Sequence, residues 1–150
     1  MFEFVNRTIP KQRRESNNGN REYKMCLDIS NNESKTELRR QRNKSDEYIN
    51  HLRQIKLTNK INKRASQLHY RLEEGHGRAI YMLGIRDDGT VEGVEIEKLF
   101  NSLNFLYKMV EIINAKVKNI RIYRGSRANN YVATVRIEIP NYKPKQSLFI

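Results

Sequence analysis

Gly75 marks a change in the spacing of apolar residues, and this change constrains the fold more than any other feature of the sequence. Before it, apolar side chains recur every three or four residues along one helical face: Ile61, Ala65, Leu68 and Leu72. This spacing predicts a helix with one buried side. After it, residues 79–85 form a short apolar run, and Asp87-Asp88-Gly89 follows as a strong hairpin turn signal. The sequence therefore predicts a helix followed by a β-hairpin.

The remaining elements follow from the same two periodicities. In chain order we predict a strand, a long helix, a β-hairpin, a helix and two strands: residues 22–29, 36–74, 79–85 with 91–94, 95–114, 117–123 and 131–139. The long helix should bend near residues 57–59, because an earlier apolar set lies on a different arc: Tyr48, Leu52 and Ile55. Two main helices packed on a small mixed β-sheet make an α+β fold with two layers.

One domain accounts for most of the chain. Its 150 residues are enough for a single α/β domain with a core, predicted over residues 21–140. Residues 1–20 are predicted to form a basic flexible tail, because a segment so poor in apolar residues cannot bury enough surface to fold alone. Residues 141–150 are predicted to be a short basic C-terminal tail.

Basic residues outnumber acidic ones, with 29 Lys and Arg against 17 Asp and Glu and a formal net charge of +12. A charge of this size indicates an anionic partner, such as nucleic acid, a membrane surface or an acidic protein. Part of it falls within an arc of about 100° on the long helix. The residues on this arc are Arg53, Lys56, Lys60, Lys63, Arg64 and Arg71, with no acid between the first and the last. A solvated face normally mixes both signs, so this stripe predicts contacts with phosphates.

A second basic group lies around the last strand pair, where Glu138 is the only acid after Lys116. An ordinary solvated hairpin is the alternative reading of this region. We expect basic residues of this region and of the two tails to bind RNA together with the helix stripe: Arg13, Arg14, Arg121, Arg124, Arg127, Lys143 and Lys145.

Several protein classes are disfavoured by the sequence. No apolar run approaches the roughly 20 residues of a membrane span. A single cysteine, Cys26, cannot form an internal disulfide, which fits a cytoplasmic protein. We find no P-loop, no zinc-ligand spacing and no nucleophile with a base, so no cofactor is expected. One catalytic alternative stays open, in which four carboxylates hold a divalent metal for RNA cleavage: Glu73, Glu74, Asp87 and Asp88.

The stretch from Arg71 to Gly93, RLEEGHGRAIYMLGIRDDGTVEG, resembles the N-terminal module of translational GTPases of the GTP-binding protein 1 and 2 type, relatives of elongation factor 1-alpha. The opening Glu-Tyr-Lys strand of that family is matched at residues 22–24, and the layout is similar over residues 22–139. The resemblance implies an environment of ribosome and tRNA. The family continues into a GTP-binding domain, whereas this chain has ten residues after Pro140, so we do not expect GTP hydrolysis.

These observations together predict a non-catalytic RNA-binding protein that docks on the ribosome as a monomer, as a hibernation, dormancy or translation-regulating factor. Its expected partners are ribosomal RNA, ribosomal proteins and, as a further candidate, tRNA, with no membrane contact. Two alternatives remain. The hairpin segment is weakly similar to the Schlafen-type AlbA core, which would make the protein a metal-dependent ribonuclease. The chain could also be a protein-interaction module for a translational GTPase.

Overall fold

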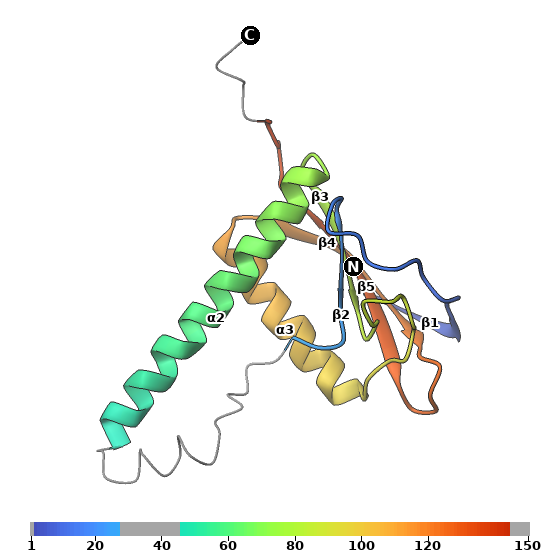
Figure 1. The fold of residues 1–150 in the computed structure, drawn as a ribbon, viewed down its shortest axis with the longest axis horizontal. Coiled ribbons are helices and arrows are strands. Elements are labelled where there is room, and N and C mark those ends of the chain that lie inside the picture. The colour runs from blue at the N-terminus through green and yellow to red at the C-terminus, as the bar shows by residue number, and fades with distance from the viewer. Residues whose placement is uncertain (1, 28–45, 145–150) are drawn as a thin grey trace.

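The computed structural model describes residues 2–27 and 46–144. Within them the elements are β1 (Phe2–Thr8), β2 (Arg21–Lys24), α2 (Asp46–Glu74), β3 (Arg78–Leu83), α3 (Ile96–Ile112), β4 (Lys116–Arg124) and β5 (Tyr131–Glu138). The strands form one sheet in the order β1-β4-β5-β3-β2. The outer pairs β1 with β4 and β2 with β3 are parallel, and both pairings of β5 are antiparallel. The predicted α+β fold, with helices on a small mixed sheet, is confirmed (Figure 1).

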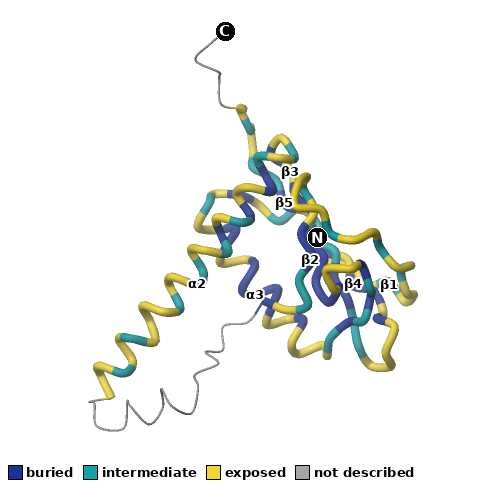
Figure 2. The backbone as a smooth tube through the Cα atoms, viewed as in Figure 1, coloured by how far each residue is buried: buried dark blue, intermediate teal, exposed yellow. Residues whose placement is uncertain are grey.

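The main core lies between the two helices and one face of the sheet. Alternate residues of the three central strands point into it: Ala79, Tyr81 and Leu83 from β3, Ile120 and Ile122 from β4, and Ala133, Val135 and Ile137 from β5. Both helices contribute their apolar faces, including Leu68 and Leu72 of α2 and Phe105 and Met109 of α3. Figure 2 shows this burial at the C-terminal end of α2 and along α3. The helical spacing before Gly75 therefore marks the buried side, as predicted.

On the other face of the sheet, which we call the open face, no helix packs within the described residues 2–27 and 46–144. A smaller apolar cluster lies there: Tyr23, Met82, Ile85, Val91, Tyr123 and Val132, with Val5 and Ile9 packed against it. The segment of residues 9–20 crosses part of this face. Its backbone is anchored by the Gln12 amide, which donates to the Gly89 carbonyl at 2.9 Å, and by the Glu15 amide, which donates to Asp87 at 2.7 Å.

The N-terminal segment differs from the prediction of a flexible tail. Residues 2–8 form β1, which pairs with β4 so that Phe2 lies opposite Ile120 and Thr8 opposite Arg124. Local composition could not indicate this, because β1 is stabilised by a strand more than a hundred residues away and not by its own apolar content. The expectation of a tail is therefore wrong over residues 2–20; the C-terminal tail is described only as far as residue 144.

The predicted return strand at residues 91–94 does not pair along β3. Both edges of β3 are occupied, by β2 on one side and β5 on the other, and residues 91–94 meet the predicted strand just after β3 ends, where the Gly93 amide donates to the Gly84 carbonyl at 2.8 Å. Val94 instead makes an isolated bridge to Tyr131. The turn itself exists, since the Gly89 amide donates to the Arg86 carbonyl at 2.8 Å. Its role is to anchor the N-terminal segment rather than to return a strand.

Helix α2 runs without a break through residues 57–59, where we expected a bend. The second apolar arc is accommodated in another way, by leaving Tyr48 and Ile55 almost half exposed on the half of the helix that projects beyond the sheet. The earlier part of the predicted helix, residues 36–45, lies outside the described residues. No helix of the described ranges has the length and apolarity that crossing a bilayer requires.

Candidate nucleic-acid interface

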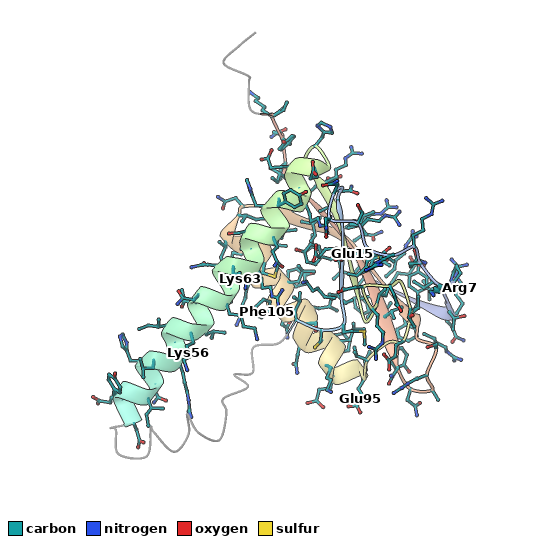
Figure 3. All side chains as sticks on the ribbon, viewed as in Figure 1. Arg7, Glu15, Lys56, Lys63, Glu95 and Phe105 are labelled. Carbon is teal, nitrogen blue, oxygen red and sulfur yellow. The ribbon has the colours of Figure 1, made fainter. Side chains whose placement is uncertain are left out.

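The basic residues of the projecting half of α2 form one continuous surface. We call it the basic stripe: Arg53, Lys56, Lys60, Lys63 and Arg64. Three of them are exposed, and Lys60 and Arg64 are half-buried. The Arg64 guanidinium donates to the Gln67 side-chain oxygen at 3.2 Å. Figure 3 marks Lys56 and Lys63 on this helix, about two turns apart. No carboxylate lies between Arg53 and Arg71 in the sequence, and the acids of α2 lie at its two ends: Asp46, Glu47, Glu73 and Glu74.

Arg71 does not belong to this surface, although its position on the helix assigned it there. Its side chain is buried, and its Nε donates to a carboxylate oxygen of Glu22 at 2.6 Å. The other guanidinium nitrogens donate to the backbone carbonyls of Ser16, Asn18 and Gly19 at 3.0–3.2 Å. Residues 16–22 cover this arc near the C-terminal end of α2, so Arg71, which we predicted to bind RNA, is not presented with the stripe: it holds the N-terminal segment in place.

Two further ionisable groups lie near Arg71. The carboxylate of Glu15 accepts a hydrogen bond from the Tyr23 amide, and partial burial is the main reason why its pKa is raised above the usual 4.5. Burial also raises the pKa of the Tyr81 hydroxyl, which has no hydrogen-bond partner among the described residues. The Tyr81 hydroxyl belongs to the interior, whereas Glu15 is half-buried beside a hollow formed by the N-terminal segment.

Arg121 lies on the open face. Two arginines that we did not predict as site residues, Arg21 and Arg136, lie there with it. The strand register places Asn119, Arg136, Ile80 and Arg21 in one row across four strands. The neighbouring row runs from Glu3 through Arg121, Thr134 and Met82 to Tyr23. The alternation of side chains along a strand could have indicated that Arg136 lies on the open face, because residues two apart, such as Thr134 and Arg136, face the same side of a sheet.

The remaining predicted residues are scattered. Arg124 is exposed at the end of β4, and Arg127 pairs with Glu92 at 3.2 Å, a carboxylate that Arg86 also contacts. Arg13 and Arg14 are exposed and line a hollow of about 640 Å³ within residues 10–23. Lys143 is exposed, and Lys145 lies outside the described residues. The structure therefore groups the stripe residues and separates them from the others.

The four carboxylates of the metal hypothesis are not brought together. Glu73 and Glu74 precede β3 and Asp87 and Asp88 follow it, so a strand of six residues, about 20 Å long, separates the pairs. Glu73 accepts from the Tyr142 hydroxyl at 2.6 Å and Glu74 from the Tyr70 hydroxyl at 2.9 Å. A hydrogen bond from Thr90 lowers the pKa of Asp88. Within residues 2–27 and 46–144, no group of three His, Cys, Asp or Glu could hold a metal ion.

Comparisons with known proteins find similarity over part of the chain. GTP-binding protein 2 of human and of mouse is 36% identical over 56 residues, which are 37% of this chain and 9% of that protein. An uncharacterized protein of Acanthamoeba polyphaga mimivirus is 31% identical over 62 residues, 41% of this chain and 33% of the viral protein. The chain thus spans less than a tenth of the GTP-binding protein and a third of the viral one. No family model and no solved structure matches.

The class that these findings define is an α+β protein with a segment similar to part of a GTP-binding protein. The matched share of GTP-binding protein 2 is small. GTP binding is therefore a property of that protein and is not carried over to this chain. The similarity to the Schlafen-type AlbA core gains no support from these findings.

Proposed function

We propose that the chain is a non-catalytic protein that binds structured RNA and docks on the ribosome. The observation that supports this best is the basic stripe, five cations on one exposed helix face without an intervening acid. Residues 53–64 span about 16 Å of helix at 1.5 Å per residue. A row of that length can contact several phosphates of one RNA helix, because phosphate contacts need charge and position rather than base identity.

The ribosome is the proposed site because of the similarity to translational GTPases. Partial similarity to GTP-binding protein 2 and to a much shorter viral protein suits a module used in different contexts. We propose that it remains on the ribosome as a hibernation, dormancy or translation-regulating factor, in contact with ribosomal RNA and proteins and, when present, tRNA.

Neutralising the stripe should weaken RNA binding and its salt dependence together. We expect Lys60→Gln with Lys63→Gln to lower affinity for a duplex RNA about 50-fold at 0.1 M salt, because each phosphate contact contributes a slope of about 0.9 in log K against log salt. The slope itself should fall by about 1.8. The measurement is fluorescence anisotropy of labelled RNA over a salt series, with ribosome cosedimentation in parallel.

The matched control neutralises two exposed lysines of the other helix, Lys98→Gln with Lys108→Gln. Its slope should stay near that of the unmodified protein. Equal losses in the two double variants would mean that net charge alone attracts RNA, and the stripe would then have no role of its own. A protein that stays in the supernatant at low salt while it binds naked RNA would refute the ribosome as its site.

A second candidate function is docking of a protein, and an exposed aromatic patch favours it. Phe2 and Phe4 of β1 and Phe100 of α3 are all about half exposed. The Phe2 and Phe100 rings stack with centroids 6.2 Å apart. Exposed apolar patches often mark protein interfaces. The partner that we propose is a GTP-binding domain, because GTP-binding protein 2 contains a segment similar to this chain.

Phe100→Ser should weaken binding to a purified GTP-binding domain of human GTP-binding protein 2 by about 30-fold, the effect of losing an aromatic anchor worth about 2 kcal/mol. Isothermal titration calorimetry would measure it. Ile112→Ser is the control, since Ile112 is exposed to a similar extent on the same helix. If wild-type protein shows no binding at concentrations up to 100 times those used for RNA, this second candidate fails.

A further inference from the structure

A cleft of about 260 Å³ lies on the open face, between the sheet and the beginning of the N-terminal segment. One wall is made by Ile9, Pro10 and Gln12. The floor is apolar and includes Ile80, Met82 and Tyr123. The Tyr123 ring is itself buried, and the Arg7 guanidinium lies 5.8 Å from its centroid, so this ring supports the floor instead of offering a free face.

Three arginines line this cleft: Arg21, Arg121 and Arg136. Arg136 and Arg21 lie on either side of Ile80 in one cross-strand row, and Arg121 lies in the adjacent row beside Thr134. They come from three different strands, β2, β4 and β5. Neighbouring cations on one sheet face repel one another. The fold therefore accepts an unfavourable concentration of positive charge at this place.

Little within the described residues offsets that charge. Arg121 makes an ion pair of 3.4 Å with Glu3 in which both side chains are about half exposed, a geometry worth little in water. Within residues 2–27 and 46–144, no ion pair involves Arg21 or Arg136. An anionic ligand would relieve the repulsion and gain up to three charge-assisted hydrogen bonds.

The neutral groups of the cleft indicate what else the ligand contains. Asn119, Thr134 and Gln12 line it beside the apolar floor. Their amide and hydroxyl groups can both donate and accept hydrogen bonds, as the edge of a nucleobase requires. An apolar floor with a few polar groups and an anion site suits a base joined to a phosphate, whereas a bare phosphate would leave the floor unused.

We propose that this cleft binds one unpaired nucleotide of an RNA strand, with its base against Ile80 over the buried side chains of Met82 and Tyr123, and with the phosphates on either side of it on Arg21, Arg121 and Arg136. The inference rests on the proposed function only in taking the ligand to be RNA. The site is distinct from the basic stripe, because α2 packs on the opposite face of the sheet. The stripe would contact a duplex, and the cleft an adjoining single-stranded residue.

Two labelled RNAs test the proposal: a blunt hairpin, and the same hairpin with an unpaired extension of four nucleotides. We expect Arg136→Met to weaken binding of the extended RNA at least tenfold and to leave the blunt hairpin within twofold, as measured by fluorescence anisotropy at fixed salt. Arg21→Met, at the other side of the floor, should give the same selective loss. Arg78→Met is the matched control, because Arg78 is highly exposed on β3, pairs with Glu138 and does not line the cleft.

The outcomes separate this proposal from the proposed function. If the stripe double variant weakens both RNAs and Arg136→Met weakens both equally, the stripe has its role and the cleft does not select unpaired RNA. If only the cleft variants weaken RNA binding, the cleft proposal is supported and the basic stripe does not contribute to binding. An acidic peptide that displaces the extended RNA more effectively than a free oligonucleotide of the same charge would overturn the assignment to a nucleotide. Circular dichroism confirms that each variant is folded.

Discussion

Replacing Arg71 with methionine should lower the free energy of unfolding by about 3–5 kcal/mol, the usual cost of removing one partner of a buried ion pair. Arg71 is only 4% exposed and Glu22 only 7%. In the Arg71→Met variant the Glu22 carboxylate keeps one ion-pair partner, Lys24, which lies 3.2 Å away and is partly exposed. Three backbone carbonyls of residues 16–19 also lose their donor. Methionine preserves most of the packing, so the loss reports the polar network.

Urea denaturation followed by circular dichroism measures this effect, and the midpoint of thermal unfolding should fall by about 10 °C for a chain of this size. Arg64→Met is the matched control, because Arg64 is half-buried on the same helix and, within residues 2–27 and 46–144, its side chain hydrogen-bonds to Gln67 alone. It should cost less than about 1 kcal/mol. Pairing Arg71→Met with Glu22→Met should recover part of the stability. If Arg71→Met and Arg64→Met lower the free energy of unfolding by similar amounts, the buried network around Arg71 does not stabilise the fold more than an ordinary hydrogen bond does.

Local periodicity was sufficient to predict the helices and the central strands. Leu68 and Leu72 of α2 and the alternating residues of β5 are buried where their spacing placed them. Periodicity was insufficient for β1, because its pairing partner β4 lies more than a hundred residues away in the sequence. It also failed for residues 91–94, where the turn at Gly89 was recognised but the occupation of both edges of β3 was not visible. Pairings between distant segments decide both cases.

The candidate site divides in the same way. The basic stripe depends on spacing within one helix, so its five members could be named from the sequence. The environment of Arg71 depends on residues 16–22 folding over the helix, and no periodicity within α2 reports that. The cleft depends on the register of four strands, which brings together Arg21, Arg121 and Arg136 from distant positions. A site whose residues are brought together by strand register cannot be predicted from the sequence before the pairing of the strands is known.

Gly89→Ala should destabilise the protein by about 2–5 kcal/mol, through two separate costs. Gly89 has φ of +92°, where an alanine pays about 1–2 kcal/mol. A Cβ at this position would also lie 1.9 Å from the Gln12 carbonyl oxygen and 2.9 Å from that of Arg13. Backbone atoms cannot move aside as a side chain can, so relieving the overlap, at about 1–3 kcal/mol, requires the N-terminal segment to shift from the turn.

Gly19→Ala separates the two costs. Gly19 has nearly the same φ, +90°, but a Cβ there would meet no atom within 4 Å. It should therefore show only the backbone cost, about 1–2 kcal/mol, in urea denaturation. The excess cost at Gly89 measures how firmly residues 9–15 are held on the open face. Trypsin supplies an independent readout, because Lys11, Arg13 and Arg14 lie in this segment.

If the excess destabilisation of about 1.4 kcal/mol or more appears as local opening, cleavage after Lys11, Arg13 or Arg14 should be about tenfold faster in Gly89→Ala than in Gly19→Ala. Equal cleavage rates would show that the overlap is absorbed elsewhere. The same comparison bears on the cleft, because Gln12, whose carbonyl the new Cβ would strike, is part of its wall. A detached segment removes that wall while Arg21, Arg121 and Arg136 stay on the sheet. Gly89→Ala should then weaken binding of the extended RNA and Gly19→Ala should not, because the nucleotide would lose its enclosure and keep its phosphate contacts.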